Sequence, residues 1–211
     1  MTYMENTYIC LAAPLFLAIL CLRKSWRRSL IFLLAGMTCC LLSAYVSSFV
    51  AGLMNIDLGT ASYTISPVAE EIIKFLPVLF YIVIFEAGKD SSINGILLVS
   101  VGFATFENVC FLTSHGTSNL LQLMIRGFGT GAMHVLCGMA ISIGLFSLWD
   151  RAWLRMVGIF AVLCFVITFH AIFNIMVSSF GLSMWIGSAV PLILIVISFM
   201  VSNSGIVHRK Y

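Results

Sequence analysis

The chain alternates between long apolar runs and short polar loops. Each run is close to the roughly 20 mostly apolar residues that an α-helix needs to cross the hydrocarbon core of a bilayer. Seven such segments are predicted, over residues 5–22, 29–51, 64–85, 93–113, 123–149, 156–178 and 183–202. We therefore expect an all-α fold, a polytopic membrane helix bundle of about seven transmembrane helices. No polar stretch is long enough for a separate soluble domain, so residues 1–211 are interpreted as one domain.

The loops alternate sharply in charge, which predicts an orientation. Nine of the eleven basic residues fall in the odd-numbered loops and the C-terminal tail, namely Arg23, Lys24, Arg27, Arg28, Lys89, Arg151, Arg155, Arg209 and Lys210. Basic loops stay in the cytoplasm, so the N-terminus is predicted outside and the C-terminus in the cytoplasm. We expect the first apolar run to be a retained helix, because a secretory signal peptide carries its positive charges before that run.

Composition favours lipid over water as the solvent of this chain. Apolar residues make up 61% of the sequence and charged residues only 9%, whereas a soluble domain carries about 25% charged residues. The lipid bilayer is thus the expected surrounding, and the net charge of +3 gives no reason to expect a nucleic-acid partner. The seven cysteines lie almost entirely inside apolar runs without a C-x-x-C spacing, so we interpret them as apolar filler.

Ionisable and amide side chains inside the predicted spans are the exception to this pattern. A charged side chain at the bilayer centre costs roughly 2.5–3.5 kcal/mol on insertion scales. The third segment carries Glu70, Glu71 and Lys74, so it must hide this polar face against other helices or a water-filled cavity. The later segments add Glu107, Asn108, His134, His170 and Asn174. Intramembrane ionisable residues are functional candidates by default.

The depths of these residues converge. At a rise of 1.5 Å per residue, Glu70 and Glu71 lie roughly 10 Å below the outer face, and Glu107 lies at about the same depth. His134 lies roughly 16 Å in, and His170 also falls in the outer half of the membrane. We therefore expect the acids and imidazoles of four helices to share one pocket.

Helical spacing predicts which of these side chains share a face. His170 and Asn174 are four residues apart and lie on one face of their helix. Glu70 and Lys74 are also four apart, in the order that favours an ion pair, whereas Glu71 points about 100° away from Glu70. One glutamate is then paired with Lys74 while the other stays available.

Carboxylate plus imidazole is the usual combination for activating water. Glu70 or Glu71, aided by a histidine, would serve as the base, and histidine or asparagine side chains can stabilise a developing oxyanion. Glu107, His134 and His170 could also ligate a divalent metal such as zinc. No H-E-x-x-H or G-x-G-x-x-G occurs, so neither a standard zincin nor a nucleotide site is expected.

Two other classes of function remain open at this point. An ion-coupled transporter also buries Glu, Lys and His along its path, although carriers usually spread polar groups across the whole membrane and often show inverted repeats. A catalytically silent membrane scaffold would keep the same fold and bind partners without cleaving them.

Four motifs carry a resemblance to a known family. The segment 70–74 resembles E-E-x-x-K, and the segment 102–108, Gly-Phe-Ala-Thr-Phe-Glu-Asn, resembles G-F-A-x-x-E-N. His134 follows Arg126 on the next helix, and the segment 170–174 resembles H-x-x-x-N. In this order on four successive helices, the motifs resemble those of the PrsW intramembrane proteases, part of a wider CAAX prenyl protease-like group. Prenyl-processing relatives look like F-x-x-x-H where this chain has Phe103 and Glu107, which favours the PrsW branch.

The resemblance implies an intramembrane endopeptidase of a bacterial-type cell membrane, with a catalytic core over about residues 64–178. Its implied substrate is a membrane protein with a single span, cut near the outer face, such as an anti-sigma factor. The residues expected to be catalytic are Glu70, Glu71, Glu107, His134, His170 and Asn174. Lys74, Asn108 and Arg126 are expected to orient them.

Overall fold

The computed structural model describes residues 4–85, 88–116, 120–147, 152–179 and 181–203. Within these ranges the chain forms helices and turns and no strand, which confirms the all-α prediction. The helices are α1 (Met4–Cys21), α2 (Lys24–Met54), α3 (Leu58–Thr64), α4 (Ser66–Phe85), α5 (Lys89–His115), α6 (Leu120–Ser147), α7 (Ala152–Ser178) and α8 (Leu182–Asn203). Arg151, Arg209 and Lys210, on which the predicted orientation partly rests, lie outside the described residues.

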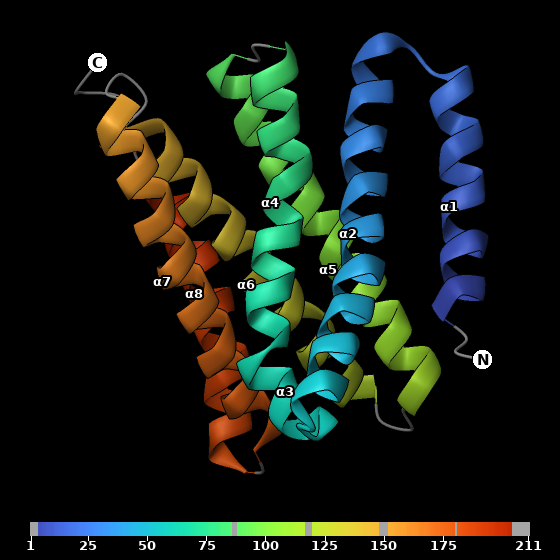
Figure 1. Ribbon diagram of the computed structural model, residues 1–211, viewed down its shortest axis with the longest axis vertical. Helices are drawn as coiled ribbons and strands as arrows, with labels where there is room; N and C mark the ends of the chain where they lie inside the picture. Colours follow the sequence, from blue (N-terminus) through green and yellow to red (C-terminus); the bar gives the residue numbers. More distant parts are fainter. Residues whose placement is uncertain (1–3, 86–87, 117–119, 148–151, 180, 204–211) are drawn as a thin grey trace.

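The helices form an upright bundle in which α4 occupies a central place (Figure 1). Six helices of the described chain are long and apolar enough to cross a membrane: α1, α2, α5, α6, α7 and α8. The seventh predicted span corresponds to α4, which has 20 residues but contains Glu70, Glu71 and Lys74. Its ionisable residues set it apart from the other spans. Its neighbours α2, α5 and α7 pack against the face that carries Glu71 and Lys74, whereas Ile72, Leu76 and Phe80 on another face are exposed.

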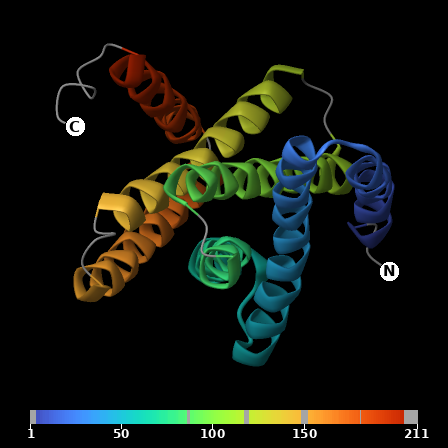
Figure 2. The ribbon, with the colours of Figure 1, turned by 90° about the horizontal axis from the view of Figure 1, so that it is seen from above.

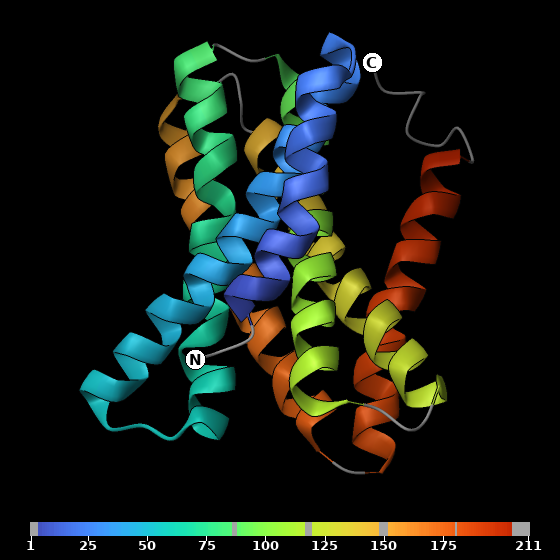
Figure 3. The same ribbon diagram turned by 90° about the vertical axis from the view of Figure 1, so that its right-hand side faces the viewer.

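A short helix that the hydrophobic pattern did not predict precedes α4. Asn55, at a φ of 54°, ends α2 in the left-handed conformation, and Asp57 then caps α3 by accepting a hydrogen bond from the Thr60 backbone N–H at 3.0 Å. Hydrogen bonds from Thr60 lower the pKa of Asp57 below its usual value. This turn reverses the chain, so that α4 runs back along α2 (Figures 1 and 3).

Two glycines let α2 and α5 approach closely. A Cβ at Gly102 of α5 would collide with the backbone carbonyl of Leu33, and one at Gly36 of α2 would collide with that of Val99. Small residues at such positions bring helix backbones together in membranes. The close approach buries Phe103 of α5 completely.

Proline shapes α4 near its middle. Pro77 has no N–H, so the carbonyl of Ile73 one turn earlier lacks its usual helical partner. The thiol of Cys39 on α2 donates to that carbonyl at 3.4 Å, which satisfies the freed group from a neighbouring helix.

The view along the bundle shows α8 diverging from the other helices toward its C-terminal end (Figures 2 and 3).

Candidate active site

Glu71 lies at the centre of a buried cluster formed by α4, α5, α6 and α7. Its side chain is fully buried, and its Oε1 accepts hydrogen bonds from Lys74 Nζ at 2.7 Å and from His170 Nδ1 at 2.8 Å. Lys74 lies one turn further along α4, whereas His170 comes from α7, 99 residues away. A buried charge is tolerated when it is paired and hydrogen-bonded in this way. The Glu71 carboxylate therefore joins α4 to α7.

Lys74 extends the cluster to α5 and α6. Its ammonium lies 2.8 Å from His134 Nδ1 and 4.6 Å from the centroid of the Phe103 ring. The expected pairing of Lys74 with Glu70 is wrong, because the ion pair is made with Glu71, three residues away. A lysine ammonium can only donate, so His134 Nδ1 accepts and a neutral His134 carries its proton on Nε2.

Glu107 accepts the hydrogen bond from that Nε2–H. Its Oε2 lies 2.5 Å from His134 Nε2, and its Oε1 lies 3.4 Å from a terminal nitrogen of Arg126. The Arg126 guanidinium in turn stacks over the Phe111 ring at 3.7 Å. The Glu107 side chain is 28% exposed, more than the other two acids of the cluster. Glu107 thus connects the buried His134 to the accessible edge of the site.

Glu70 and Glu71 each keep one buried carboxylate oxygen, Oε2, without a hydrogen-bond partner, and Glu70 is the more exposed of the two acids. Glu70 Oε2 lies 3.6 Å from His170 Nε2 and is buried without a hydrogen-bond partner, while the side chain keeps 16% exposure. Since His170 donates from Nδ1 to Glu71, a neutral His170 presents a lone pair at Nε2. A buried acceptor left unpaired costs about 1–3 kcal/mol, so this space is suited to a water molecule or a cation.

The donor set around this space is one that a divalent metal uses. One ligand atom each from Glu70, His134 and His170 lie within 4.8 Å of one another, and two imidazoles with a carboxylate is a common zinc set. The unpaired Glu70 Oε2 and the free His170 Nε2 fit a cation, while both His134 nitrogens already hydrogen-bond. Glu107, the carboxylate predicted for this set, is replaced in it by Glu70. Depth along the helices could not distinguish the two acids, which lie at one level.

The two predicted asparagines bond to backbone carbonyls of neighbouring helices. Asn174 Nδ2 donates to the Ser62 carbonyl of α3 at 2.8 Å, and Asn108 Nδ2 donates to the Gly127 carbonyl of α6 at 3.2 Å. These bonds fix α7 against α3 and α5 against α6. The oxyanion role of Asn174 stays a prediction.

Phe103 is a member of the site to which the sequence assigned no role. It is fully buried beneath Lys74, and its ring lies 4.9 Å from that of His134. A signal was present, because Phe103 and Glu107 are four residues apart and share a helix face.

An apolar cavity adjoins the cluster. It has a volume of about 470 Å³ and lies among α5, α6, α7 and α8, with Phe111, Phe173 and Trp185 on its walls. Arg126 and Thr130 form part of its lining, and Arg126 is the residue that contacts Glu107. The cavity is therefore connected through Arg126 to Glu107, the exposed edge of the acid and imidazole cluster.

Comparison with known proteins identifies a family. Residues 24–202 match the model of a family described as PrsW family intramembrane metalloprotease. No curated protein and no solved structure matches the chain. The matched residues include α4, α5, α6 and α7, which supply every member of the cluster.

Proposed function

The chain belongs to the PrsW family of intramembrane metalloproteases, and from this premise we propose that its buried cluster hydrolyses a peptide bond of a membrane-protein substrate with Glu70 as the group that activates water. The observation that carries the assignment is the pair formed by Glu70 Oε2 and His170 Nε2, 3.6 Å apart. Glu70 Oε2 has no hydrogen-bond partner, so this pair offers two open polar atoms to one water.

Glu71 is proposed to support this chemistry without touching the water, because its side chain is 0% exposed whereas that of Glu70 is 16% exposed. Its Oε1 already accepts from Lys74 and His170, so it holds the His170 ring with Nε2 directed at Glu70. A carboxylate that orients a histidine through its second nitrogen raises the basicity of that ring and fixes its tautomer. Glu71 and Lys74 are therefore positioning residues, and Glu70 is the base that receives the proton of the attacking water.

A divalent metal such as zinc would take the place of the water between Glu70 Oε2 and His170 Nε2, with His134 as its third ligand once one of the two hydrogen bonds of that ring is released. When bound, the metal would polarise the scissile carbonyl and acidify a water. Three neighbouring residues are proposed to position the site and to exclude water from it. Glu107 and Arg126 hold His134 from the exposed side, and Phe103 excludes solvent beneath Lys74. Asn174, one turn from His170, is the amide proposed to bind the developing oxyanion.

The substrate is proposed to be a protein with a single membrane span that is unwound near the outer face. The apolar cavity beside Arg126 supports this proposal, since it offers a hydrophobic segment a path to Glu107. The cluster also lies far from the basic end of the bundle, because Glu107 follows Lys89 by 18 residues, or about 27 Å of helix. A bacterial-type membrane and an anti-sigma factor as the substrate are proposed on the family resemblance.

The test is cleavage of single-span substrates by the full chain in liposomes. Wild-type protein and the Asp90→Asn variant, which removes a carboxylate at the other end of α5, are expected to release the same fragments. Glu70→Gln is expected to release none while it inserts and purifies like wild type. Fragments of unchanged yield from Glu70→Gln would overturn the assignment of the base.

A further inference from the structure

A second cavity, with a polar lining, lies at the end of the bundle opposite the acid and imidazole cluster. Its volume is about 660 Å³, and it lies between the N-terminal parts of α2 and α5. The polar residues that line it are Lys24, Ser25, Arg28, Ser29, Ser91 and Asn94. No acidic side chain of the described ranges belongs to this lining. The cavity thus combines two cations with hydroxyl and amide groups and is suited to an anion.

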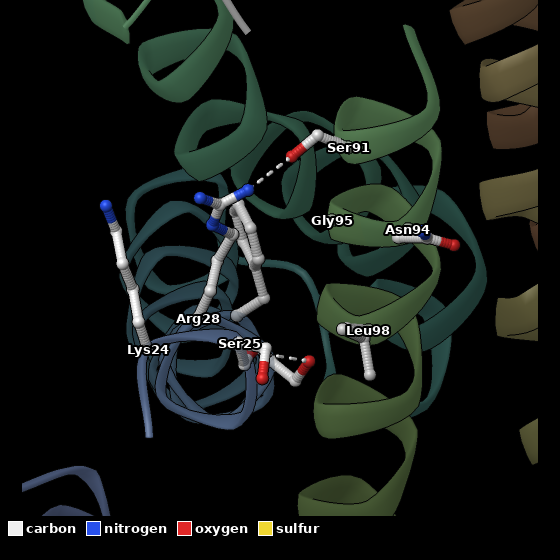
Figure 4. Close-up of a pocket in the computed structure, with 9 residues that line it drawn as sticks. Lys24, Ser25, Arg28, Ser91, Asn94, Gly95 and Leu98 are labelled. Atoms are coloured by element: carbon white, nitrogen blue, oxygen red, sulfur yellow. Dashed lines mark hydrogen bonds between the residues drawn. The ribbon is translucent and has the colours of Figure 1, made fainter. Parts of the chain in front are cut away.

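Arg28 is held in position across this cavity. Figure 4 shows its side chain reaching from α2 toward Ser91 of α5, with Lys24 extending from the same helix beside it. The Arg28 guanidinium donates to Ser91 Oγ at 3.1 Å and lies 6.0 Å from the centroid of the Tyr81 ring. The Tyr81 hydroxyl is 2.9 Å from the same Ser91 Oγ. Arginine carries five donors, so an oriented guanidinium that gives one to Ser91 can bind an anion with others.

An apolar cavity of about 730 Å³ continues from the polar one and shares Lys24, Arg28 and Phe32 with it. Beyond Lys24, its lining along α2 extends from Arg27 to Ala35, which is about 12 Å at 1.5 Å per residue. Along α4 it extends from Phe85 to Pro77, again about 12 Å. The groove therefore leaves the cations and runs along the apolar part of the bundle.

Two of its aromatic walls face outward, since Phe80 is 61% exposed and Phe85 is 65% exposed. In a membrane these surfaces meet acyl chains. A cationic cavity next to an apolar groove of this length matches a molecule that has a phosphate at one end and a hydrocarbon chain attached to it.

We propose that this pair of cavities binds an anionic phospholipid, with the phosphate of the headgroup against Arg28 and Lys24 and an acyl chain between α2 and α4. Basic pockets between transmembrane helices at the cytoplasmic side bind anionic lipid headgroups, and this is the predicted cytoplasmic end of the chain. A free phosphate would leave the apolar groove unused, and an acidic polypeptide would have to bury backbone polar groups in it. The binding site is separate from the proposed catalytic cluster and does not depend on its chemistry.

The test is native mass spectrometry of the full chain released from detergent with defined lipids. Phosphatidylglycerol is expected to remain bound in preference to phosphatidylcholine with identical acyl chains. Arg28→Gln is expected to weaken phosphatidylglycerol binding about fivefold, as the loss of one basic contact near a membrane surface does. Arg23→Gln is the matched control, because it removes one charge from a residue that lines neither cavity, and it is expected to bind like wild type.

Glycerol phosphate, which has the headgroup charge without the chain, separates lipid from free phosphate. The proposal expects it not to displace the bound lipid at equal concentration. Equal retention of the two lipids, equal weakening by both variants, or displacement by glycerol phosphate or by an acidic peptide would each overturn the proposal. Arg28→Lys distinguishes loss of charge from a folding defect caused by replacing Arg28. It keeps the positive charge, so it is expected to retain more lipid than Arg28→Gln.

Discussion

His170 donates from Nδ1 to Glu71 Oε1 at 2.8 Å, and this single bond sets the direction of the other imidazole nitrogen. The ring is 1% exposed and cannot turn freely, so Nε2 stays 3.6 Å from Glu70 Oε2. Adjacent acids of one helix thereby receive different tasks. Glu71 holds the histidine, and Glu70 keeps an open oxygen toward the site.

We expect Glu71→Gln and Glu70→Gln to separate stability from activity. Removing the Glu71 charge leaves the Lys74 ammonium buried without its ion-pair partner, which should cost about 3–5 kcal/mol of unfolding free energy. Glu70→Gln removes a charge whose Oε2 has no partner, so its thermal unfolding temperature should equal or exceed that of wild type. Both variants should lose cleavage.

Thermal unfolding in one detergent, monitored by circular dichroism, measures the first difference, and cleavage of a reconstituted substrate measures the second. A Glu71→Gln protein as stable as wild type would show that Glu71 is not the charge that compensates Lys74. The double variant Glu71→Gln with Lys74→Met is the matched control, since it removes both members of the pair and should recover part of the lost stability.

Much of this site could be predicted because depth is encoded in chain position. Counting residues along alternating helices placed Glu70, Glu71, Glu107, His134 and His170 at one level, and the structure brings their side chains together. The count could not choose the pairs. Separations of three and four residues both suit an ion pair in a helix, and the neighbours from α6 and α7 decided that Lys74 faces Glu71.

Features that depend on the backbone could not be predicted in the same way. The acceptor of Asn174 is the carbonyl of Ser62, and every residue has such a carbonyl. The short helix α3, which presents it, has seven residues and no apolar period long enough to detect. The local sequence signal for α3 is Asp57, whose side chain accepts a hydrogen bond from the Thr60 N–H at the start of the helix. The helix that follows is too short to be separated from the next span by its hydrophobic pattern.

Removal of metal should abolish cleavage. A chelator with high affinity for zinc is expected to inactivate the reconstituted protein, and zinc is expected to restore activity in proportion to the metal bound. Glu70, His134 and His170 form the set that would hold it, so His170→Ala should lower the bound zinc measured by mass spectrometry after dialysis. Cys164→Ser is the control, because Cys164 is exposed on α7 away from the set and should leave the zinc content unchanged.

Gly102→Ala and Gly127→Ala should change stability in opposite directions. A Cβ at Gly102 meets the Leu33 backbone, which cannot move without separating α5 from α2, so the cost should be about 1–3 kcal/mol as in other overpacked sites. A Cβ at Gly127 meets nothing within 4 Å, and alanine is a better helix former than glycine by about 1 kcal/mol.

The thermal unfolding temperatures of the two variants, compared with that of wild type, test whether their stabilities change in opposite directions. Since Phe103 lies next to Gly102, the Gly102→Ala protein should also lose cleavage, whereas Gly127→Ala should cleave normally. Equal stability of the two variants would mean that α2 and α5 are not held at the separation seen here.

Asn174→Ala tests whether this amide acts on the reaction or only on packing. The bond to Ser62 is worth about 1 kcal/mol, and its loss alone should shift the unfolding temperature slightly without changing the turnover number. Removing an oxyanion donor lowers kcat by about 100- to 1,000-fold. We expect the larger loss, in kcat and with KM unchanged, because Asn174 is one turn from His170 on the same face of α7.

Asn108→Ala is the matched control, since it removes a similar bond to the Gly127 carbonyl and should lower kcat by less than about tenfold. Equal kcat losses in the two variants would reduce Asn174 to a packing residue and leave the oxyanion to another donor.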